Sequence, residues 1–444
     1  MSHVPMTMPE LAIDTQAHPF SHTTTFVQLE DGRIFHASFR ASNFSEDGGL
    51  TWSDVVEMQD INGDPVGGSC TCLVKLSDKN SIGLAAQTKA EPDDPRWEGR
   101  QMLFWRSDDN GETWQPPVPI SKPGIFCQAL QDTMLRTSSG RIILPTFSSM
   151  GQPNGLNDRT APMTGKLVHN QFVATAGHFF DPHFSVVVVY YSDDDGQTWQ
   201  RNADGALIIM LQEGTIYSYV NEPTITQVKP GRLLMFMRTG LGRVFQAWSN
   251  DNGETWTRTQ PTVLASSTTP SQLRTLPNGH LLCVWNQETA SEIKRGQNRT
   301  RLSSAISRDG GRVWEFFQNI QSIHETTRVE PGPIEPTHPM ELYFSAGHSA
   351  VEREVESVHI DCDAHTRHSY PSVFVDAARE HVIVATSLHG MYEPDPVEAK
   401  LVSQSTGVPE CGQQRKILPF KWFYGGKEPA DNPFLKEAYE PAKP

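Results

Sequence analysis

Short apolar runs recur in pairs along this chain, and each pair encloses a polar turn. In the first pair, residues 24–29 and 33–39 flank the turn Glu30-Asp31-Gly32. Such short runs, rich in Val, Ile, Leu, Phe and Thr, are typical of β-strands, and helical periodicity is largely absent. The pattern therefore predicts six antiparallel hairpins, at residues 24–39, 71–86, 132–147, 224–237, 272–285 and 370–387.

One motif, Ser-x-Asp-x-Gly-x-Thr-Trp, recurs five times along the chain. The copies begin at Ser45, Ser107, Ser192, Ser249 and Ser307, and the last has Val313 in place of Thr. A motif repeated at intervals of 57 to 85 residues is the mark of a repeat architecture. Its Asp-Gly, Asn-Gly or Gly-Gly step supplies the positive φ angles of a tight turn, and its Trp can cover the junction with the next repeat.

Six hairpins with added outer strands predict an all-β fold, a six-bladed β-propeller of four-stranded sheets. We expect residues 1–404 to form the propeller, with a strand from the N-terminal segment closing the last blade. The longest interval between motifs predicts an insertion in blade three, at about residues 150–183. It could be a lid over the propeller mouth or a solvated loop. Residues 405–444 are expected to be an irregular tail packed on the propeller, and could form a contact between copies.

Composition narrows the classes of partner. The net charge of −15 argues against nucleic acid or an anionic membrane surface as a partner, although a local Arg cluster could still bind a small anion. The six cysteines are sparse and form no Cys-x-x-Cys, so reduced thiols are expected. No apolar leader and no 18-residue apolar run is visible, which predicts a cytoplasmic protein unless a leader was removed. The His and Asp spacings fit neither zinc nor EF-hand motifs, so we expect no metal and no cofactor.

Candidate chemistry gathers where the innermost strands of a propeller would converge. Polar or ionisable side chains open several inner strands, and others end the second strands. Those opening inner strands include His22, Cys70 or Cys72, Glu222 and Tyr370, and those ending second strands include Arg40, Arg238 and Gln287. Such residues at equivalent positions of the repeats are hard to explain by packing alone.

The five motif copies are Asp boxes, and through them the chain resembles the sialidase-like superfamily of β-propellers. The segment around Glu222 reads Asn-Glu-Pro-Thr, Arg238 follows one hairpin later, and Tyr370 stands in Ser-Tyr-Pro-Ser. Arg299 precedes the motif at Ser307 within Arg-Thr-Arg-Leu, with Arg301 as a close second choice. The resemblance implies that Tyr370 is a nucleophile, Glu222 its base, and the arginines a clamp for an anionic group.

Two departures from the superfamily pattern concern the first blade. The segment Phe-Ser-His-Thr around His22 stands where an Arg-containing motif is expected, and residues 40–44 lack the usual acidic proton donor. His22, or Asp93 or Asp94 on the corresponding loop of blade two, could supply the proton. The chain is therefore nearer to the neuraminidase-like branch than to a typical sialidase. Arg40 and Gln287 are further candidates for substrate contact.

The leading hypothesis is an exo-acting glycoside hydrolase that removes a terminal anionic sugar. A different carbohydrate-active propeller, either a glycosidase for another sugar or a uronate lyase using His22 or Tyr370, remains open, as does a non-catalytic glycan-binding propeller. Two geometric expectations follow. The five motif tryptophans should be largely buried, and Glu222 should lie about 2.6 to 3.2 Å from the Tyr370 hydroxyl, with Arg238 in the same cavity.

Overall fold

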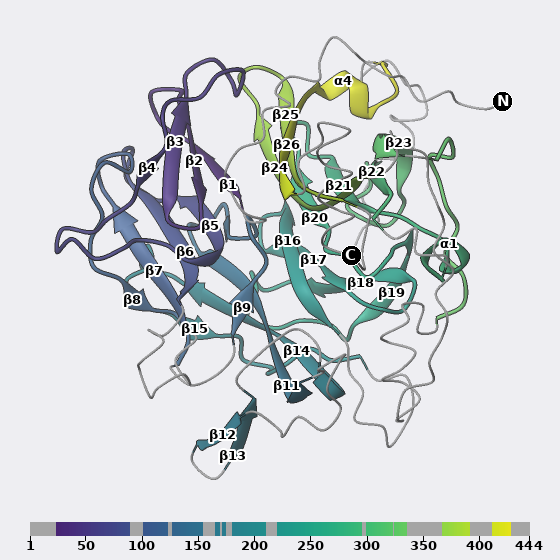
Figure 1. Ribbon diagram of the computed structural model, residues 1–444, viewed down its shortest axis with the longest axis horizontal. Helices are drawn as coiled ribbons and strands as arrows, with labels where there is room; N and C mark the ends of the chain where they lie inside the picture. The colour runs from purple at the N-terminus through teal and green to yellow at the C-terminus, as the bar shows by residue number, and fades with distance from the viewer. Residues whose placement is uncertain are drawn as a thin grey trace.

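The computed structural model describes residues 24–88, 101–122, 127–153, 165–168, 171–174, 180–209, 220–294, 299–322, 324–334, 366–390 and 411–427. These residues form six antiparallel sheets arranged around a central axis (Figure 1), so the predicted six-bladed propeller is confirmed. In each blade the first predicted run is the innermost strand and the chain proceeds outward.

The strands of each blade follow one another in sequence order. Blade one contains β1 (Thr25–Gln28), β2 (Ile34–Ser38), β3 (Ala41–Ser45) and β4 (Val56–Glu57). Blade two contains β5 (Ser69–Lys75), β6 (Ile82–Thr88), β7 (Gln101–Ser107) and β8 (Val118–Pro119). Blade three contains β10 (Leu135–Arg136), β11 (Ile142–Pro153), β14 (Phe180–Ser192) and β15 (Gln200–Arg201), with β9 (Gln128–Ala129) also paired to β11.

The other three blades repeat this order. Blade four contains β16 (Asn221–Lys229), β17 (Arg232–Arg238), β18 (Arg243–Ser249) and β19 (Gln260–Ala265). Blade five contains β20 (Gln272–Thr275), β21 (Leu281–Asn286), β22 (Arg301–Ser307) and β23 (Glu315–Ser322), with α1 (Ala290–Lys294) after β21. Blade six contains β24 (Thr366–Asp376), β25 (His381–Gly390) and β26 (Cys411–Pro419), followed by α4 (Phe420–Phe423).

The prediction of an irregular C-terminal tail is wrong for residues 411–423. β26 pairs with β25 over its whole length, and α4 buries Trp422 and Phe423. The strand was missed because its inward positions are polar: Gln413 and Arg415 are buried and interrupt the apolar alternation that marks a half-buried strand. The N-terminal strand expected to close this blade lies outside the described residues.

The insertion in blade three extends the blade's own strands. β11 and β14 remain paired out to Pro153 and Phe180, with one register shift between Met150 and Gln152. A short hairpin of β12 (Gly165–Val168) and β13 (Gln171–Ala174) lies beyond their ends, at the rim of the propeller (Figure 1).

The first four motif turns are held by the same set of hydrogen bonds. In blade two, the Ser107 hydroxyl donates to Asp109, and the Gly111 amide donates to Ser107 Oγ. The Thr113 amide and hydroxyl donate to the two Asp109 oxygens, at 2.9 and 2.6 Å. The fifth turn keeps the amide bond to its Asp through Val313, which has no hydroxyl for the second. The Asp that recurs in every motif copy is therefore an acceptor that shapes a turn.

The motif glycines and tryptophans pack each blade on the one before it. A Cβ on Gly196, whose φ is 88°, would lie 2.0 Å from the Phe104 ring of the preceding blade, and Trp199 lies edge-on to that ring at 5.3 Å. The ring closes in the same way, because a Cβ on Gly49 of blade one would meet Ile383 of blade six at 2.6 Å. Glycine is required where a neighbouring blade approaches this closely.

Burial of the motif tryptophans follows the prediction in three of the five turns. Trp114, Trp256 and Trp314 are between 1% and 8% exposed, whereas Trp52 and Trp199 are half-buried. Within the part of the chain that the structure describes, Cys70, Cys72, Cys127 and Cys283 are buried thiols that are not joined in disulfide bonds. No helix in that part is both long and apolar enough to cross a membrane.

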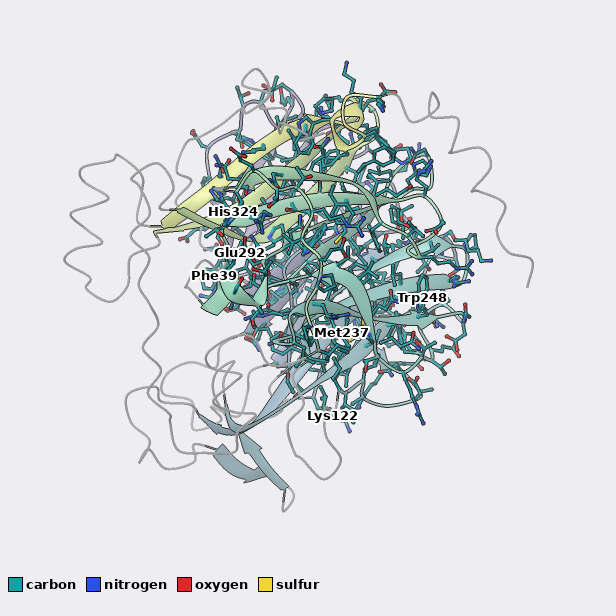
Figure 2. All side chains as sticks on the ribbon, turned by 90° about the vertical axis from the view of Figure 1, so that its right-hand side faces the viewer. Phe39, Lys122, Met237, Trp248, Glu292 and His324 are labelled. Carbon is teal, nitrogen blue, oxygen red and sulfur yellow. The ribbon has the colours of Figure 1, made fainter. Side chains whose placement is uncertain are left out.

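The motif turns and the inner-strand openings lie at opposite ends of the propeller. A motif follows the far end of each third strand, whereas the second strand ends where the first begins. Figure 2 shows this separation, with Phe39, Glu292 and His324 on one side and Trp248, next to the motif at Ser249, toward the other. We call the first side the mouth face. Tyr370 lies near the start of the first strand of its blade and Arg238 at the end of the second, so both lie on the mouth face, as expected from the repeat pattern.

Candidate active site

Three predicted residues from blades four and six meet at the mouth face. The Tyr370 hydroxyl donates to Glu222 Oε1 at 3.0 Å, within the range expected from the sequence. Arg238 Nη1 donates to Glu222 Oε2 at 2.5 Å and lies 3.2 Å from the Tyr370 oxygen. The Arg238 guanidinium therefore holds both the Tyr370 phenol and the Glu222 carboxylate, the two groups between which a proton would pass.

The inner strands place these side chains by means of β-bulges. In blade four, the pairing of β16 with β17 shifts between Asn221 and Thr224, and Glu222 inside the bulge has φ 41°. In blade six, the pairing of β24 with β25 shifts between Ser369 and Ser372, and Tyr370 has φ 52°. A bulge re-aims a side chain, and non-glycine residues at positive φ store strain that is typical of functional sites.

Cys70 of blade two has the equivalent position, with φ 57° in the bulge between Ser69 and Cys72. Blades two, four and six therefore share a β-bulge with one residue at positive φ near the start of the inner strand. Sequence inspection identified Glu222 and Tyr370 and left blade two open between Cys70 and Cys72. It could not have shown the bulges, because a bulge has no signature in a strand of this composition.

Burial sets the protonation state of the nucleophile candidate. The pKa of Tyr370 is raised above the ordinary tyrosine value chiefly because the hydroxyl is desolvated, although the whole residue is half-buried, and the nearby Glu222 carboxylate adds to the effect. Arg238 and Arg299 act in the opposite direction, since their positive charges favour the phenolate. The resting phenol is thus neutral at physiological pH, with an acceptor in contact and two cations to stabilise the anion that forms on proton loss.

Arg299 reaches this site from blade five. Its Nη1 donates to Ser369 Oγ at 3.1 Å, and its guanidinium carbon lies 5.3 Å from the centre of the Tyr370 ring. The His368 amide donates to the Arg299 carbonyl, which ties the residue to β24. Arg299 is half-buried, whereas Arg238 is only 4% exposed and committed to Glu222. Arg299 is therefore the arginine better placed to meet a ligand anion.

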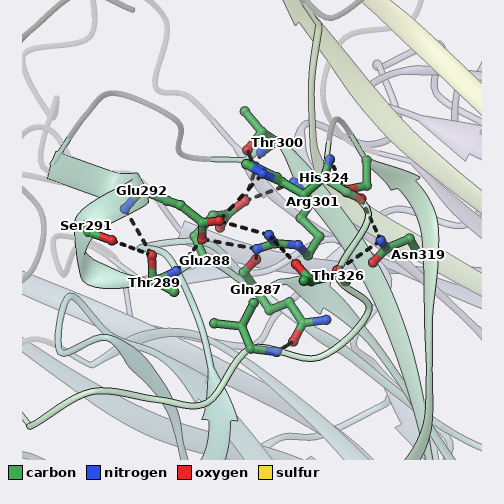
Figure 3. A network of polar contacts seen from close by, with 12 residues as sticks. Gln287, Glu288, Thr289, Ser291, Glu292, Thr300, Arg301, Asn319, His324 and Thr326 are labelled. Carbon is green, nitrogen blue, oxygen red and sulfur yellow. Dashed lines mark hydrogen bonds and ion pairs between the residues drawn. The ribbon is translucent and has the colours of Figure 1, made fainter. Parts of the chain in front are cut away.

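Arg301 and Gln287 lie in a separate polar network (Figure 3). Arg301 is 1% exposed, and its two terminal nitrogens donate to both Glu292 oxygens, to the Gln287 carbonyl and to Thr326. Gln287 donates to the Thr327 carbonyl. These contacts correct their prediction as substrate ligands: both side chains brace the chain that follows β23.

The same network holds a group that sequence reasoning missed. Glu288 Oε1 accepts hydrogen bonds from the amides of Thr300 and Arg301, at 2.9 and 3.0 Å, directly after Arg299. Burial raises the pKa of Glu288 to about 7. Nothing in the local sequence distinguishes this glutamate from a surface one, since its burial depends on the packing of α1 and β22.

The other predicted residues are only partly placed. Arg40 follows β2 on the mouth face, half-buried, with its guanidinium carbon 5.5 Å from the centre of the Phe39 ring. His22, Asp93 and Asp94 lie outside the described residues. Among the residues that are described, no group of three or more His, Cys, Asp or Glu side chains could hold a metal ion.

Comparisons with known proteins agree with this architecture. Residues 83–382 match the family model described as the BNR repeat-like domain. A crystal structure of a protein of unknown function from Dyadobacter fermentans is similar over 92% of this chain and 97% of its own, at 16% identity and a TM-score of 0.51. Trypanosoma rangeli sialidase, in complex with 2,3-difluorosialic acid as a covalent intermediate, is similar over 96% of this chain, at 14% identity and a TM-score of 0.51.

The match to the sialidase covers 58% of that protein's length, and identities this low establish the fold alone. The family model, in contrast, spans well over half of the present chain and includes four of the five motif turns. The protein therefore belongs to the family of the BNR repeat-like domain.

Proposed function

We propose that the protein is an exo-acting glycoside hydrolase that removes a terminal anionic sugar. The observation that carries the proposal is the 3.0 Å contact between the Tyr370 hydroxyl and Glu222, bridged by Arg238. A nucleophile in contact with a base, with the base oriented by a third group, is the arrangement that covalent catalysis requires.

In the first step, Tyr370 Oη attacks the anomeric carbon while its proton passes to Glu222. The glycosidic bond breaks, its electron pair stays on the leaving oxygen, and an acid protonates that oxygen. His22 and Asp93 remain the predicted candidates for the acid. Water then attacks the anomeric carbon and gives one proton to the deprotonated acid. The bond to Tyr370 breaks with its electron pair on the phenolate oxygen, Glu222 returns its proton to that oxygen, and the sugar is released with retained configuration.

The choice of an anionic sugar follows from the nucleophile. A carboxylate attacking a carbon that bears a carboxylate would meet like-charge repulsion, whereas a neutral phenol would not. Arg299 supports the same choice, because its guanidinium lies beside the Tyr370 ring and can form charge-assisted hydrogen bonds to an acidic group.

A screen of aryl glycosides and acidic glycans, with mass analysis of the products, tests the proposal. A hydrolase releases a saturated sugar with the mass of one added water. An unsaturated product that absorbs in the near ultraviolet would replace the proposal with a uronate lyase. Binding without turnover would favour a glycan-binding propeller. Tyr370→Phe serves as the control for background hydrolysis, since it lacks the attacking oxygen.

A further inference from the structure

A carboxylate beneath the mouth gathers contacts from several blades. Asp132 of blade three is 7% exposed and has φ 57°. Its Oδ1 accepts from Thr25 Oγ1 of blade one at 2.9 Å. Its Oδ2 accepts from Ser372 Oγ at 2.6 Å and from the Val373 amide at 3.0 Å, both in blade six.

Arg274 of blade five completes this group across the axis. Its Nη2 donates to Asp132 Oδ2 at 2.5 Å and to the Asp132 carbonyl at 2.6 Å. Its Nε donates to the Val373 carbonyl at 2.7 Å, and its Nη1 donates to Gln272 and to the Leu273 carbonyl. All five N–H groups of the guanidinium are thus used within the protein, which excludes a role as a ligand-binding cation.

A second link reaches Tyr370 itself. Gln131 Nε2 donates to the Tyr370 carbonyl at 3.0 Å, and the Gln131 carbonyl accepts from Gln272 Nε2 at 2.8 Å. Blade three therefore contacts the nucleophile's backbone through Gln131 and the two residues after Pro371 through Asp132.

These contacts replace hydrogen bonds that blade six lacks. The pairing of β24 with β25 is interrupted between Ser369 and Ser372, and Pro371 has no amide hydrogen to donate. In the described part of blade six β24 is also an edge strand, so backbone groups that point away from β25 must find partners elsewhere or remain unpaired in a buried place. Gln131, Asp132 and Arg274 supply such partners at the Tyr370 carbonyl and at the Val373 amide and carbonyl, and Asp132 also accepts from the Ser372 hydroxyl.

We propose that Asp132 and Arg274 are positioning residues that hold the Tyr370 bulge, so that the alignment of the nucleophile is set by blades three and five as well as by its own blade. The inference rests on the proposed function only where it concerns turnover. Its structural part, the effect of the pair on Tyr370, can be tested without any substrate.

The experiment uses the full chain carrying tyrosine labelled with ¹³C at the ζ carbon, with the Tyr370 resonance identified by its loss in Tyr370→Phe. Asp132→Asn keeps the size of the side chain but removes its charge. Arg274→Lys keeps the positive charge but removes the planar guanidinium with its five N–H donors. The matched control is Arg308→Ala, which breaks an ion pair with Glu315 at 2.6 and 2.9 Å near a motif turn, away from the mouth.

The proposal predicts that Asp132→Asn and Arg274→Lys shift the Tyr370 resonance and move its titration toward the ordinary tyrosine value, whereas Arg308→Ala lowers only the melting temperature. With an active substrate, both variants should lose kcat by roughly 10- to 100-fold at similar KM, as misplacement of a reacting group does. An unchanged Tyr370 resonance in folded variants would overturn the proposal. If Asp132→Asn does not fold, Gln131→Ala takes its place. If the wild type hydrolyses no glycan, the proposed function is wrong. The Tyr370 resonance still tests whether Asp132 and Arg274 position Tyr370.

Discussion

The Tyr370 hydroxyl donates a hydrogen bond to Glu222 across 3.0 Å of space and 148 residues of sequence. The radial symmetry of the propeller makes this contact, because equivalent positions of blades four and six both face the axis. Arg238 joins the two groups and is almost wholly buried with Glu222, each side chain being 3% exposed. Glu222 and Arg238 therefore form a buried ion pair that also contacts the candidate nucleophile.

Breaking this ion pair should be costly, and its two halves should be strongly coupled. We expect Glu222→Gln and Arg238→Met each to lower the free energy of unfolding by about 3 kcal/mol, since each leaves a buried charge without its partner. The double variant should lose much less than the sum of the two. Urea unfolding measures all three. Additivity within about 0.5 kcal/mol would show that the two side chains do not interact in solution.

Substitution of Arg299 should affect substrate binding, whereas substitution of Arg301 should affect stability. Arg299→Lys replaces the planar guanidinium beside Tyr370 with an ammonium group. We therefore expect KM for the best acidic substrate to rise roughly tenfold or more, with little change in melting temperature. Arg301→Lys disrupts the bidentate contact with Glu292 and should lower the melting temperature with KM nearly unchanged. Steady-state kinetics and thermal melts of both variants provide the comparison. The reverse pattern would return Arg301 to the ligand site.

Glu288 should make stability depend on pH. Its pKa is raised from 4.5 to about 7 by burial, so the folded chain binds this proton more tightly than the unfolded chain does. The resulting stability is fully present below about pH 4.5 and is lost as pH rises through about 7, a change on the order of 3 kcal/mol.

Glu288→Gln mimics the protonated acid, so its stability relative to wild type should increase between pH 5 and pH 8. Urea unfolding across that range measures the difference, and Glu325→Gln, at an exposed position, is the control. A difference that is constant with pH would mean that Glu288 does not titrate in this window.

The C-terminal strand should be essential for folding. β26 pairs with β25 from Cys411 to Pro419, and the turn after it buries Trp422, Phe423 and Tyr424. A chain ending at residue 404 would leave β25 as an unpaired edge and expose the apolar surface that these residues cover. We expect no cooperative thermal transition from such a chain. A sharp melt near the wild-type temperature would show that the segment is not needed for folding.

The sequence allowed the blades to be counted because the motif turns and the hairpin pattern are local and repeat. It also brought Glu222, Arg238 and Tyr370 together, since the repeat register determines which residues face the axis. It misassigned Arg301 and Gln287, because their partners lie in the short helix α1 (Glu292) and in the chain after β23 (Thr326 and Thr327), and no periodicity encodes the path of either segment. The axial contacts of Asp132 were missed for a related reason: they join blades three, five and six through individual hydrogen bonds to side chains and to the Val373 amide, and no strand pairing marks them in the sequence.

The central claim is that Tyr370 becomes covalently bonded to the sugar. It is tested most directly by incubating the enzyme with a fluorinated glycosyl fluoride of the sugar identified in the glycan screen, followed by peptide mass mapping. Fluorine beside the anomeric carbon slows both steps, whereas the good leaving group keeps the first one fast, so the intermediate should accumulate. We predict one sugar added to the peptide that contains Tyr370, and neither adduct nor turnover in Tyr370→Phe. Turnover by Tyr370→Phe at the wild-type rate, or an adduct on another residue, would contradict the account.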